Sequence, residues 1–178
     1  MIKHFLKLLV YISILGIQLG CSSTAENNVK NRQSEKPNVI LIVSDDHGTD
    51  DAGCYGNNAI KTPNLDYLAS QGMRFTDAYC TSASCSASRS VILTGLYNHA
   101  NGQYGHKHGY NHFSAHDHIM SLPVLLDDIA GYETARIGKY HVAPDKVFRF
   151  ETILEADQRN PVAMADSCLD FIRKGQIL

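Results

Sequence analysis

Apolar residues along the chain gather in short runs that alternate with helical patterns. Residues 38–44 (NVILIVS) form a continuous apolar, β-branched run, which is typical of a strand buried on both faces of a parallel sheet. Residues 73–79 alternate apolar and polar side chains and predict a second strand, and residues 133–137 predict a short third strand. Strands that alternate with helices indicate an α/β fold, in which helices sandwich a mostly parallel sheet.

Four helices are predicted from the residues that start and stop them. Thr62 precedes Pro63 at the first turn of one helix, and Gly72 follows its last residue. Similar start and stop residues predict helices within residues 86–95, 121–131 and 160–175. On the last helix, four apolar residues are expected to share one face: Val162, Ala165, Leu169 and Ile172.

The N-terminus has the pattern of an export signal. Basic residues precede the apolar run 8–19, and Gly20 and Cys21 follow it. The run is too short for a membrane span. Cys21 resembles the lipidated cysteine of bacterial lipoproteins, although Gln18 departs from that pattern. We expect residues 1–21 to direct export to the bacterial periplasm or cell envelope, with a lipid on Cys21 as membrane anchor; the alternative is ordinary cleavage nearby.

Polar composition separates this signal from the folded part. Residues 22–36 predict a flexible tether, and residues 37–178 the folded domain. No closing sheet strand is evident after Gly175, so we expect residues 37–178 to be the N-terminal part of a truncated domain. The charge balance, 16 basic against 18 acidic residues, gives no signal for nucleic acid.

The cysteine pattern does not indicate a disulfide scaffold. The chain has 5 cysteines, an odd number that leaves at least one unpaired. A bridge between Cys54 and Cys80 in an oxidising compartment stays open at this stage.

Two polar pairs follow predicted strands. Asp45 and Asp46 come directly after the run 38–44, and Lys139 and His141 follow the strand at 133–137. In parallel α/β sheets, ligands bind beyond the carboxyl ends of the strands, so we expect both pairs at one edge of the sheet. Carboxylates suit Ca²⁺ or Mg²⁺. The alternative for the aspartates is a solvated acidic loop.

The segment CSASR, residues 85–89, predicts a reactive centre. Cys85 starts a predicted helix, where the positive end of the helix dipole favours anions and a lowered thiol pKa. Arg89 lies one turn further on the same face and could hold an oxyanion. A buried structural cysteine is the alternative.

Residues 85–95 (CSASRSVILTG) resemble the sulfatase signature Cys-x-Pro-Ser-Arg…Leu-Thr-Gly. Further segments agree with that family in order and spacing, and together they are far more specific than any one of them: 38–46, 62–69, 75–78 and 138–141 (GKYH). The resemblance runs from residue 37 to the end and implies an alkaline-phosphatase-like α/β domain. Within the family, similarity to the heparan N-sulfatase (sulfamidase) subfamily is carried by three stretches: 96–113, 121–126 and 138–144.

The resemblance implies a hydrolase that degrades sulfated glycans such as glycosaminoglycans. Cys85 would be oxidised to formylglycine, whose hydrate attacks sulfur, and Asp45, Asp46 and residue 85 would bind Ca²⁺, or Mg²⁺ in its place. Arg89 would hold the formylglycine, and Lys139 would bind the sulfate. His141 would position the nucleophile or act as an acid–base group.

Maturation and substrate contacts follow from the same resemblance. Ala87 stands where many members have proline, the residue that the aerobic formylglycine-generating enzyme favours, and alanine there is similar to motifs that radical-based anaerobic maturing enzymes accept. Either enzyme is therefore expected as the maturing partner. Residues 99–118 contain six histidines. They lack a sharp zinc-ligand spacing, so we expect a polar loop that contacts substrate, with His99 as its candidate substrate-binding residue.

Three other functions stay open. The enzyme alternatives are an O-sulfatase for another polysaccharide and a phosphoesterase of the same superfamily. The non-enzyme alternative is a truncated or degenerate homologue. Asp45, Asp46 and residue 85 supply few of the about six to eight oxygens that Ca²⁺ takes, so these residues alone should bind the ion poorly. We expect residues 37–178 to be inactive and marginally folded by themselves, because half of the sheet and core that the resemblance implies would be missing.

Overall fold

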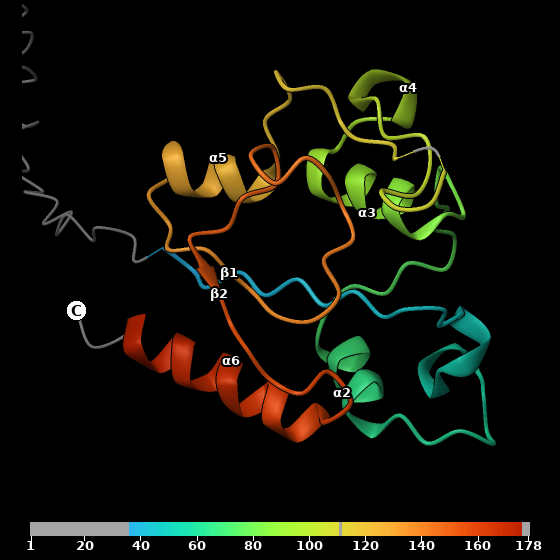
Figure 1. The fold of residues 1–178 in the computed structure, drawn as a ribbon. Coiled ribbons are helices and arrows are strands. Elements are labelled where there is room, and N and C mark those ends of the chain that lie inside the picture. Colours follow the sequence, from blue (N-terminus) through green and yellow to red (C-terminus); the bar gives the residue numbers. More distant parts are fainter. Residues whose placement is uncertain (1–35, 111, 176–178) are drawn as a thin grey trace, which may run out of the picture. The chain divides into compact units, whose positions relative to one another are not determined.

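The structure is a computed structural model that describes residues 36–110 and 112–175. It divides into two units, one ending at Val43 and one spanning Ser44–Leu178, and all described helices and strands lie in the second. Their order is η1 (Thr49–Asp51), η2 (Gly53–Tyr55), α2 (Pro63–Gln71), α3 (Cys85–Thr94), α4 (Asn98–Asn101), α5 (Leu122–Asp128), β1 (Ala135–Arg136), β2 (Thr152–Ile153) and α6 (Pro161–Gly175) (Figure 1). The predicted signal, and the tether except residue 36, lie outside the described residues, so those predictions stand untested.

The strand predicted at residues 38–44 is wrong for this structure. No strand is formed there, and the side chains of residues 39–43 are between 38% and 77% exposed. A strand exists only where a neighbour supplies a ladder of hydrogen bonds, and none of the described residues forms such a ladder with this run. Its apolar side chains are therefore left exposed.

The strand predicted at residues 73–79 is also wrong. The segment is irregular, and its apolar side chains Met73, Phe75 and Tyr79 are 82%, 62% and 87% exposed. Alternation alone suits a half-buried strand, but these side chains meet no second layer. The segment is held instead by polar contacts of its backbone, such as the hydroxyl of Tyr55 donating to the carbonyl of Phe75 at 2.8 Å.

The α/β class is confirmed by a parallel pair of strands among the helices. β1 occupies the centre of the strand predicted at 133–137, with Ala135 opposite Thr152 and Arg136 opposite Ile153. β2 was not predicted. The connection between the strands, residues 137–151, leaves the carboxyl end of β1 and carries the two predicted site residues Lys139 and His141.

The predicted helices are confirmed, while two of their capping side chains act elsewhere. Asn160 caps α6, since its side-chain oxygen accepts from the backbone N–H of Ala163 at 3.1 Å. Thr62 precedes α2, but its hydroxyl accepts from the N–H of Gly53 and donates to Asp66. Ser121 precedes α5, but its hydroxyl donates to the carbonyl of Val147 at 2.6 Å. Both hydroxyls therefore tie a helix start to a distant segment.

A small core is formed largely by the connection between β1 and β2. Val142, Val147, Phe148 and Ala115 are buried, with partly buried Leu93, Ile119 and Tyr140 packed against them. Leu93 comes from α3, which also packs against α4 and α5. The core therefore fixes the segment on either side of His141 against the helix that starts at Cys85.

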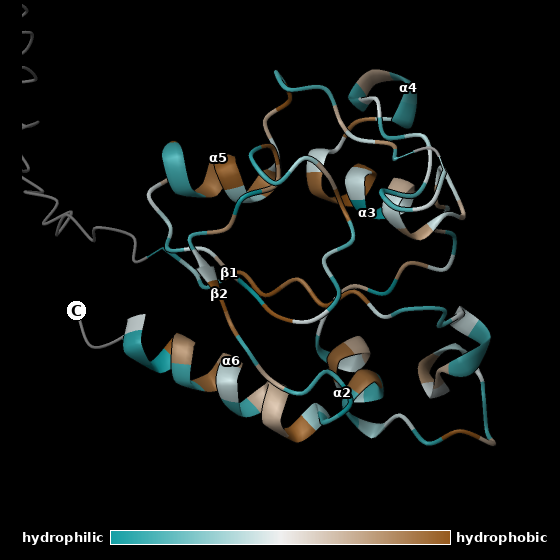
Figure 2. Ribbon diagram, in the orientation of Figure 1, coloured by the Kyte–Doolittle hydropathy of each residue, from teal (hydrophilic) through white to brown (hydrophobic). Residues whose placement is uncertain are grey.

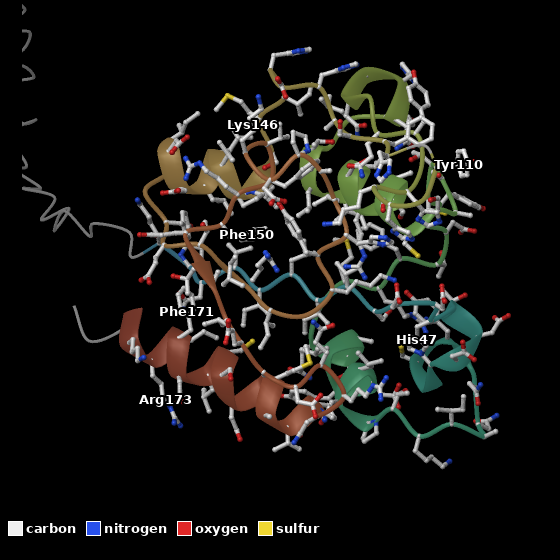
Figure 3. The ribbon with its side chains drawn as sticks, in the orientation of Figure 1. His47, Tyr110, Lys146, Phe150, Phe171 and Arg173 are labelled. Atoms are coloured by element: carbon white, nitrogen blue, oxygen red, sulfur yellow. The ribbon has the colours of Figure 1, made fainter. Side chains whose placement is uncertain are left out.

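The predicted apolar face of α6 is only partly correct. Ile172 is half-buried, but Val162 and Leu169 are 67% and 42% exposed and Ala165 is exposed. The more protected face holds Met164, Cys168 and Phe171, so it is rotated from the predicted one. Figure 2 shows hydrophobic residues on several sides of this helix, and Figure 3 shows Phe171 and Arg173 pointing to opposite sides. Because the apolar residues of α6 are not confined to one stripe, periodicity could not fix the buried side.

The described helices and cysteines bear on a membrane span and on the disulfide left open above. None of the helices in residues 36–110 and 112–175 is long and apolar enough to cross a bilayer. Cys54 and Cys80 are both free thiols in the structure, so the bridge that the sequence left open is not formed there.

Tyr140, which packs against the core, is expected to make the free energy of unfolding depend on pH in the alkaline range. Its hydroxyl donates to the carbonyl of buried Phe148 at 2.8 Å, and burial, followed by Asp145, raises the pKa of Tyr140 from 10.0 to about 12. Between these two values the folded state keeps a proton that the unfolded state has lost, so stability falls as pH rises from 10 to 12. We expect Tyr140→Phe to flatten this decline, measured by urea unfolding across that range. An unchanged slope would contradict the assignment.

Candidate active site

Helix α3 presents Cys85 at its first turn. Ser84 is extended at the N-cap position, and its carbonyl accepts the first helical hydrogen bond, from the N–H of Ser88 at 2.8 Å. The other side of the helix is fixed because Ser86, Ala87 and Ser90 are fully buried. Cys85 is left half-buried at the positive end of the helix dipole, where an anion is favoured.

A buried polar network holds α3 to α4. The side-chain amide of Asn98 donates to the carbonyls of Ala87 and Gln103, at 3.0 and 2.7 Å. Asn101 is fully buried and donates to the hydroxyl of Ser90 at 3.2 Å. Buried polar groups with satisfied partners rigidify their surroundings, so this network, which the sequence patterns did not predict, positions the helix of Cys85.

Asp45, Arg89 and Lys139 meet although they are far apart in the sequence. The ammonium of Lys139 lies 2.9 and 2.7 Å from the two carboxylate oxygens of Asp45. The guanidinium of Arg89 lies 3.4 Å from the same carboxylate and donates to the backbone carbonyl of Lys139 at 2.9 Å. Arg89 is the least exposed of the three residues, with 12% of its side chain accessible, so it lies deepest in the cluster.

The charges in this cluster reinforce one another. The hydrogen bond from Lys139, aided by Arg89, holds the pKa of Asp45 below its ordinary value of 3.8. Asp45, and after it Cys85, raises the pKa of Lys139 above 10.5. Asp45 is therefore an anion and Lys139 a cation at neutral pH, and Cys85 lies within electrostatic reach of the ammonium. The site combines two cations with the half-buried thiol of Cys85, which suits a ligand that carries negative charge.

Asp45, Asp46 and Cys85 form a group that could hold a metal ion. Each offers a ligand atom, and the three atoms lie within 4.8 Å of one another. Asp46 has a left-handed backbone with φ of 50°, a strained conformation of the kind that gathers at functional sites. The two carboxylates fit a hard cation such as Ca²⁺ or Mg²⁺, and the thiol would fit it only after conversion to an oxygen donor.

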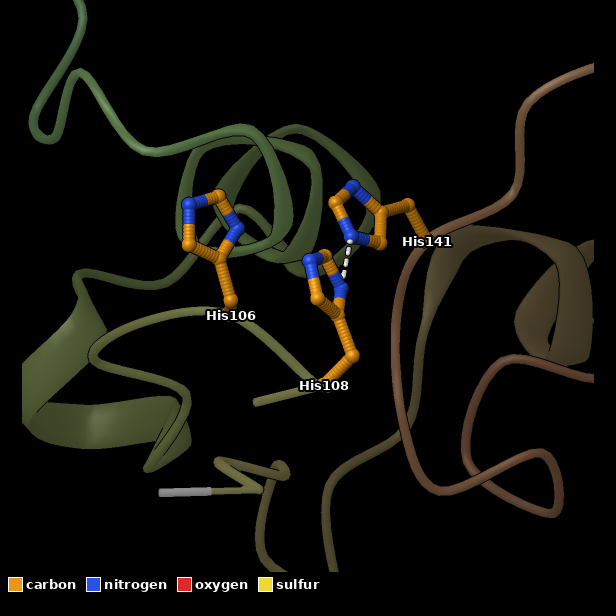
Figure 4. A group of neighbouring side chains, drawn as sticks. All are labelled: His106, His108 and His141. Carbon is orange, nitrogen blue, oxygen red and sulfur yellow. Dashed lines mark hydrogen bonds between the residues drawn. The ribbon is translucent and has the colours of Figure 1, made fainter. Parts of the chain in front are cut away.

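His141 lies in a second group, with His106 and His108 (Figure 4). Its Nε2 atom is 2.7 Å from Nδ1 of His108, and its backbone is left-handed with φ of 57°. Burial, and then the neighbouring His108 and Lys139, lower the pKa of His141 below 6.5. The ring is therefore neutral at neutral pH, as a proton acceptor must be.

His99 lies outside both groups. It is exposed on α4 and stacks on Tyr97, with ring centroids 5.7 Å apart. Its predicted role in substrate binding stays a prediction. The histidines that do reach a predicted site residue are His106 and His108, which the sequence patterns did not single out. The one signal in the sequence was the spacing of two positions between His106 and His108. That spacing does not show that the folded chain brings both residues next to His141.

The sequence is similar to known proteins over most of its folded part. The sulfatase family profile matches residues 37–166. Human N-sulphoglucosamine sulphohydrolase is 45% identical over 114 residues, which are 64% of this chain and 22% of the relative. An N-acetylglucosamine-6-O-sulfatase of Bacteroides thetaiotaomicron is 39% identical over 115 residues, 65% of this chain and 20% of the relative.

An ulvan-active sulfatase of Formosa agariphila is 39% identical over 118 residues, 66% of this chain and 22% of the relative. The chain thus spans about a fifth of the length of these curated relatives. The family match covers well over half of the chain and includes both the Cys85 helix and the connection after β1. The chain therefore belongs to the sulfatase family.

Proposed function

We propose that the protein hydrolyses sulfate ester or sulfamate bonds in sulfated glycans, with the nucleophile made from Cys85. The observation that carries this proposal is the convergence of Asp45, Arg89 and Lys139 beside Cys85. These residues come from three distant segments and belong to the motifs that resemble the sulfatases. A structural ion pair alone would not need a cysteine at a helix start next to it.

Two groups that are not part of the unmodified chain would supply the central chemistry. Formylglycine at position 85, when hydrated, offers an oxygen nucleophile for attack on sulfur. A Ca²⁺ ion held by Asp45, Asp46 and residue 85, with Mg²⁺ as the alternative, would polarise sulfate oxygens. Since the three residues supply few of the about six to eight ligands that Ca²⁺ takes, we propose that further ligands complete the site.

The residues of the chain have distinct proposed roles around these groups. Arg89, pinned between Asp45 and the carbonyl of Lys139, holds the oxygen of residue 85 in place. Lys139 is 35% exposed, so it can leave Asp45 in part and bind a sulfate oxygen of the substrate. His141, neutral at neutral pH, accepts or returns a proton at one ring nitrogen.

The substrate class is proposed from the relatives. Similarity to the human N-sulphoglucosamine sulphohydrolase supports an N-sulfated glycan, and glycosaminoglycan breakdown as the context. The bacterial relatives named as an O-sulfatase and an ulvan-active sulfatase support the alternative, an O-sulfatase for another polysaccharide. Export with lipid attachment at Cys21, His99 as a substrate contact and a formylglycine-generating or anaerobic maturing enzyme as partner remain parts of the proposal.

Paired assays test the proposed reaction. Protein purified from its native host, and so matured there, is expected to release sulfate from N-sulfated glucosamine residues, with O-sulfated and phosphorylated sugars as parallel substrates. Turnover of O-sulfated substrates alone would favour the alternative. If only the phosphorylated sugar were hydrolysed, the sulfatase proposal would be wrong.

Lys139 gives a test within the site. We expect Lys139→Met to lower kcat/KM for the sulfated substrate on the order of 10²-fold or more, because a fixed charge that stabilises the transition state is lost. Lys146→Met is the matched control, because Lys146 pairs with Asp117 on an exposed surface, away from this cluster. Equal activity of the two variants in steady-state kinetics would remove Lys139 from the proposed site.

A further inference from the structure

Three imidazole rings gather beside the proposed site. His106 and His108 come from one loop, and His141 comes from the connection between β1 and β2 (Figure 4). Each ring offers one nitrogen, and the three nitrogens lie within 4.8 Å of one another. The ring centroids are 4.6 to 5.4 Å apart. This group is distinct from Asp45, Asp46 and Cys85, whose donors are of a different chemical kind.

The backbone holds the three histidines close. The N–H of Lys107, between His106 and His108, donates at 3.2 Å to the hydroxyl of Ser86, which is fully buried in α3. The carbonyl of His106 accepts from the N–H of Phe113 at 3.0 Å. On the other side, the residue after His141 is the fully buried Val142 of the core. Both segments are therefore anchored on either side of the cluster.

The ring nitrogens are available as metal ligands. The 2.7 Å contact between His141 and His108 needs one donor and one acceptor nitrogen, so the accepting ring is neutral and carries a lone pair that a metal ion could take in place of the hydrogen bond. The Nδ1 atom of His141 is buried and has no hydrogen-bond partner among the described residues. His106 and His108 are exposed, which leaves an open route for an ion.

We propose that His106, His108 and His141 bind a divalent transition-metal ion that favours imidazole ligands, with Zn²⁺ as the representative. Tetrahedral Zn²⁺ at about 2.0–2.1 Å from each nitrogen holds its ligands roughly 3.3 Å apart. The exposed His106 and His108 can reach that spacing by rotation of their side chains. Three protein nitrogens leave a fourth position for water. Ca²⁺ and Mg²⁺ prefer oxygen ligands, so the two groups select different ions.

Binding there would have a consequence for catalysis, and this consequence rests on the proposed function. His141 is the proposed proton-transfer residue, and an ion bound to its ring would take the lone pair that accepts the proton. Zn²⁺ would therefore inhibit sulfate release. If Zn²⁺ bound to the three histidines but did not inhibit sulfate release, the proposed role of His141 in the reaction would be wrong, while the metal site would still be supported.

The binding test uses Zn²⁺ calorimetry and Co²⁺ absorption on the full chain, with excess Ca²⁺ present to occupy the carboxylates. We expect His106→Ala and His108→Ala each to weaken binding by at least about tenfold, since losing even an outer partner of a metal ligand costs that much. His118→Ala is the matched control, because His116 and His118 have the same spacing and stacked rings 5.7 Å apart but belong to no three-ligand group among the described residues.

The thermal midpoint separates loss of the site from loss of the fold. Zn²⁺ should raise the midpoint of the wild type and of His118→Ala, and not that of His108→Ala. Equal affinity in all variants would overturn the proposal. Zn²⁺ binding that depends on Asp46 or Cys85 and not on the histidines would also overturn it. So would binding of sulfate without binding of Zn²⁺, an outcome that is possible because Lys107 and Lys139 also face His141.

Discussion

Cys85→Ala is expected to lower kcat/KM for the sulfated substrate on the order of 10⁴-fold or more, because removing a catalytic nucleophile costs at least this much in other hydrolases. Cys85 lies at the start of α3 beside Lys139, and alanine cannot be converted to an aldehyde. The fold should be unaffected, since alanine suits a first helical turn. Sulfate release under steady-state conditions measures the effect.

Cys80→Ala provides the control for this substitution. Cys80 is an exposed free thiol five positions earlier in the chain, outside any helix. Its replacement should leave turnover and urea unfolding unchanged. If Cys85→Ala retained the activity of the Cys80→Ala variant, the nucleophile would lie elsewhere and the proposed reaction would be contradicted.

Phe148→Ala should cause the largest loss of stability, about 3–5 kcal/mol in the free energy of unfolding. Phe148 is fully buried and packs with Val142, Val147 and Ala115 in a core of few residues. Truncation removes the apolar contacts and leaves a cavity that this small cluster cannot easily fill. Urea unfolding followed by circular dichroism measures the change. Val142 adjoins His141, so the geometry of the histidine group should loosen as well.

Phe75→Ala serves as the matched comparison. Phe75 is 62% exposed, and the hydrogen bond that it accepts from the hydroxyl of Tyr55 involves its backbone carbonyl, which the substitution keeps. Its truncation should change the free energy of unfolding by no more than about 0.5 kcal/mol. Similar losses for the two phenylalanines would show that the core does not lie where the structure places it.

Local sequence signals predicted the helices well and the strands poorly. Gly95 ends α3 in a left-handed conformation with φ of 67°, and Asn160 caps α6, so both boundaries depend on neighbouring residues alone. A strand depends on a distant partner. Residues 38–44 have a strong apolar pattern yet form no strand, while β2 is formed by two residues whose only distinction is their pairing with β1.

The site was predictable where motifs fixed its residues. Asp45 and Lys139 are 94 positions apart and lie in contact, although the strand expected before Asp45 is not formed; β1 directs the segment of Lys139 to the place where Arg89 and Asp45 lie. His106 and His108 could not be predicted as neighbours of His141. Their approach depends on a loop tied to Ser86 by one backbone hydrogen bond, and no periodicity reports such a contact.

The chemical state of residue 85 is the most direct test of the proposed function. Protein from the native host, digested and analysed by mass spectrometry, should yield a peptide around position 85 in which the CH₂–SH group of cysteine is replaced by an aldehyde. The buried Ala87 two residues later bears on which maturing enzyme acts and on the fraction of Cys85 that is converted, so the same digest should be quantified for both forms of the peptide. An unmodified thiol at Cys85 in protein that releases sulfate would contradict the proposed nucleophile.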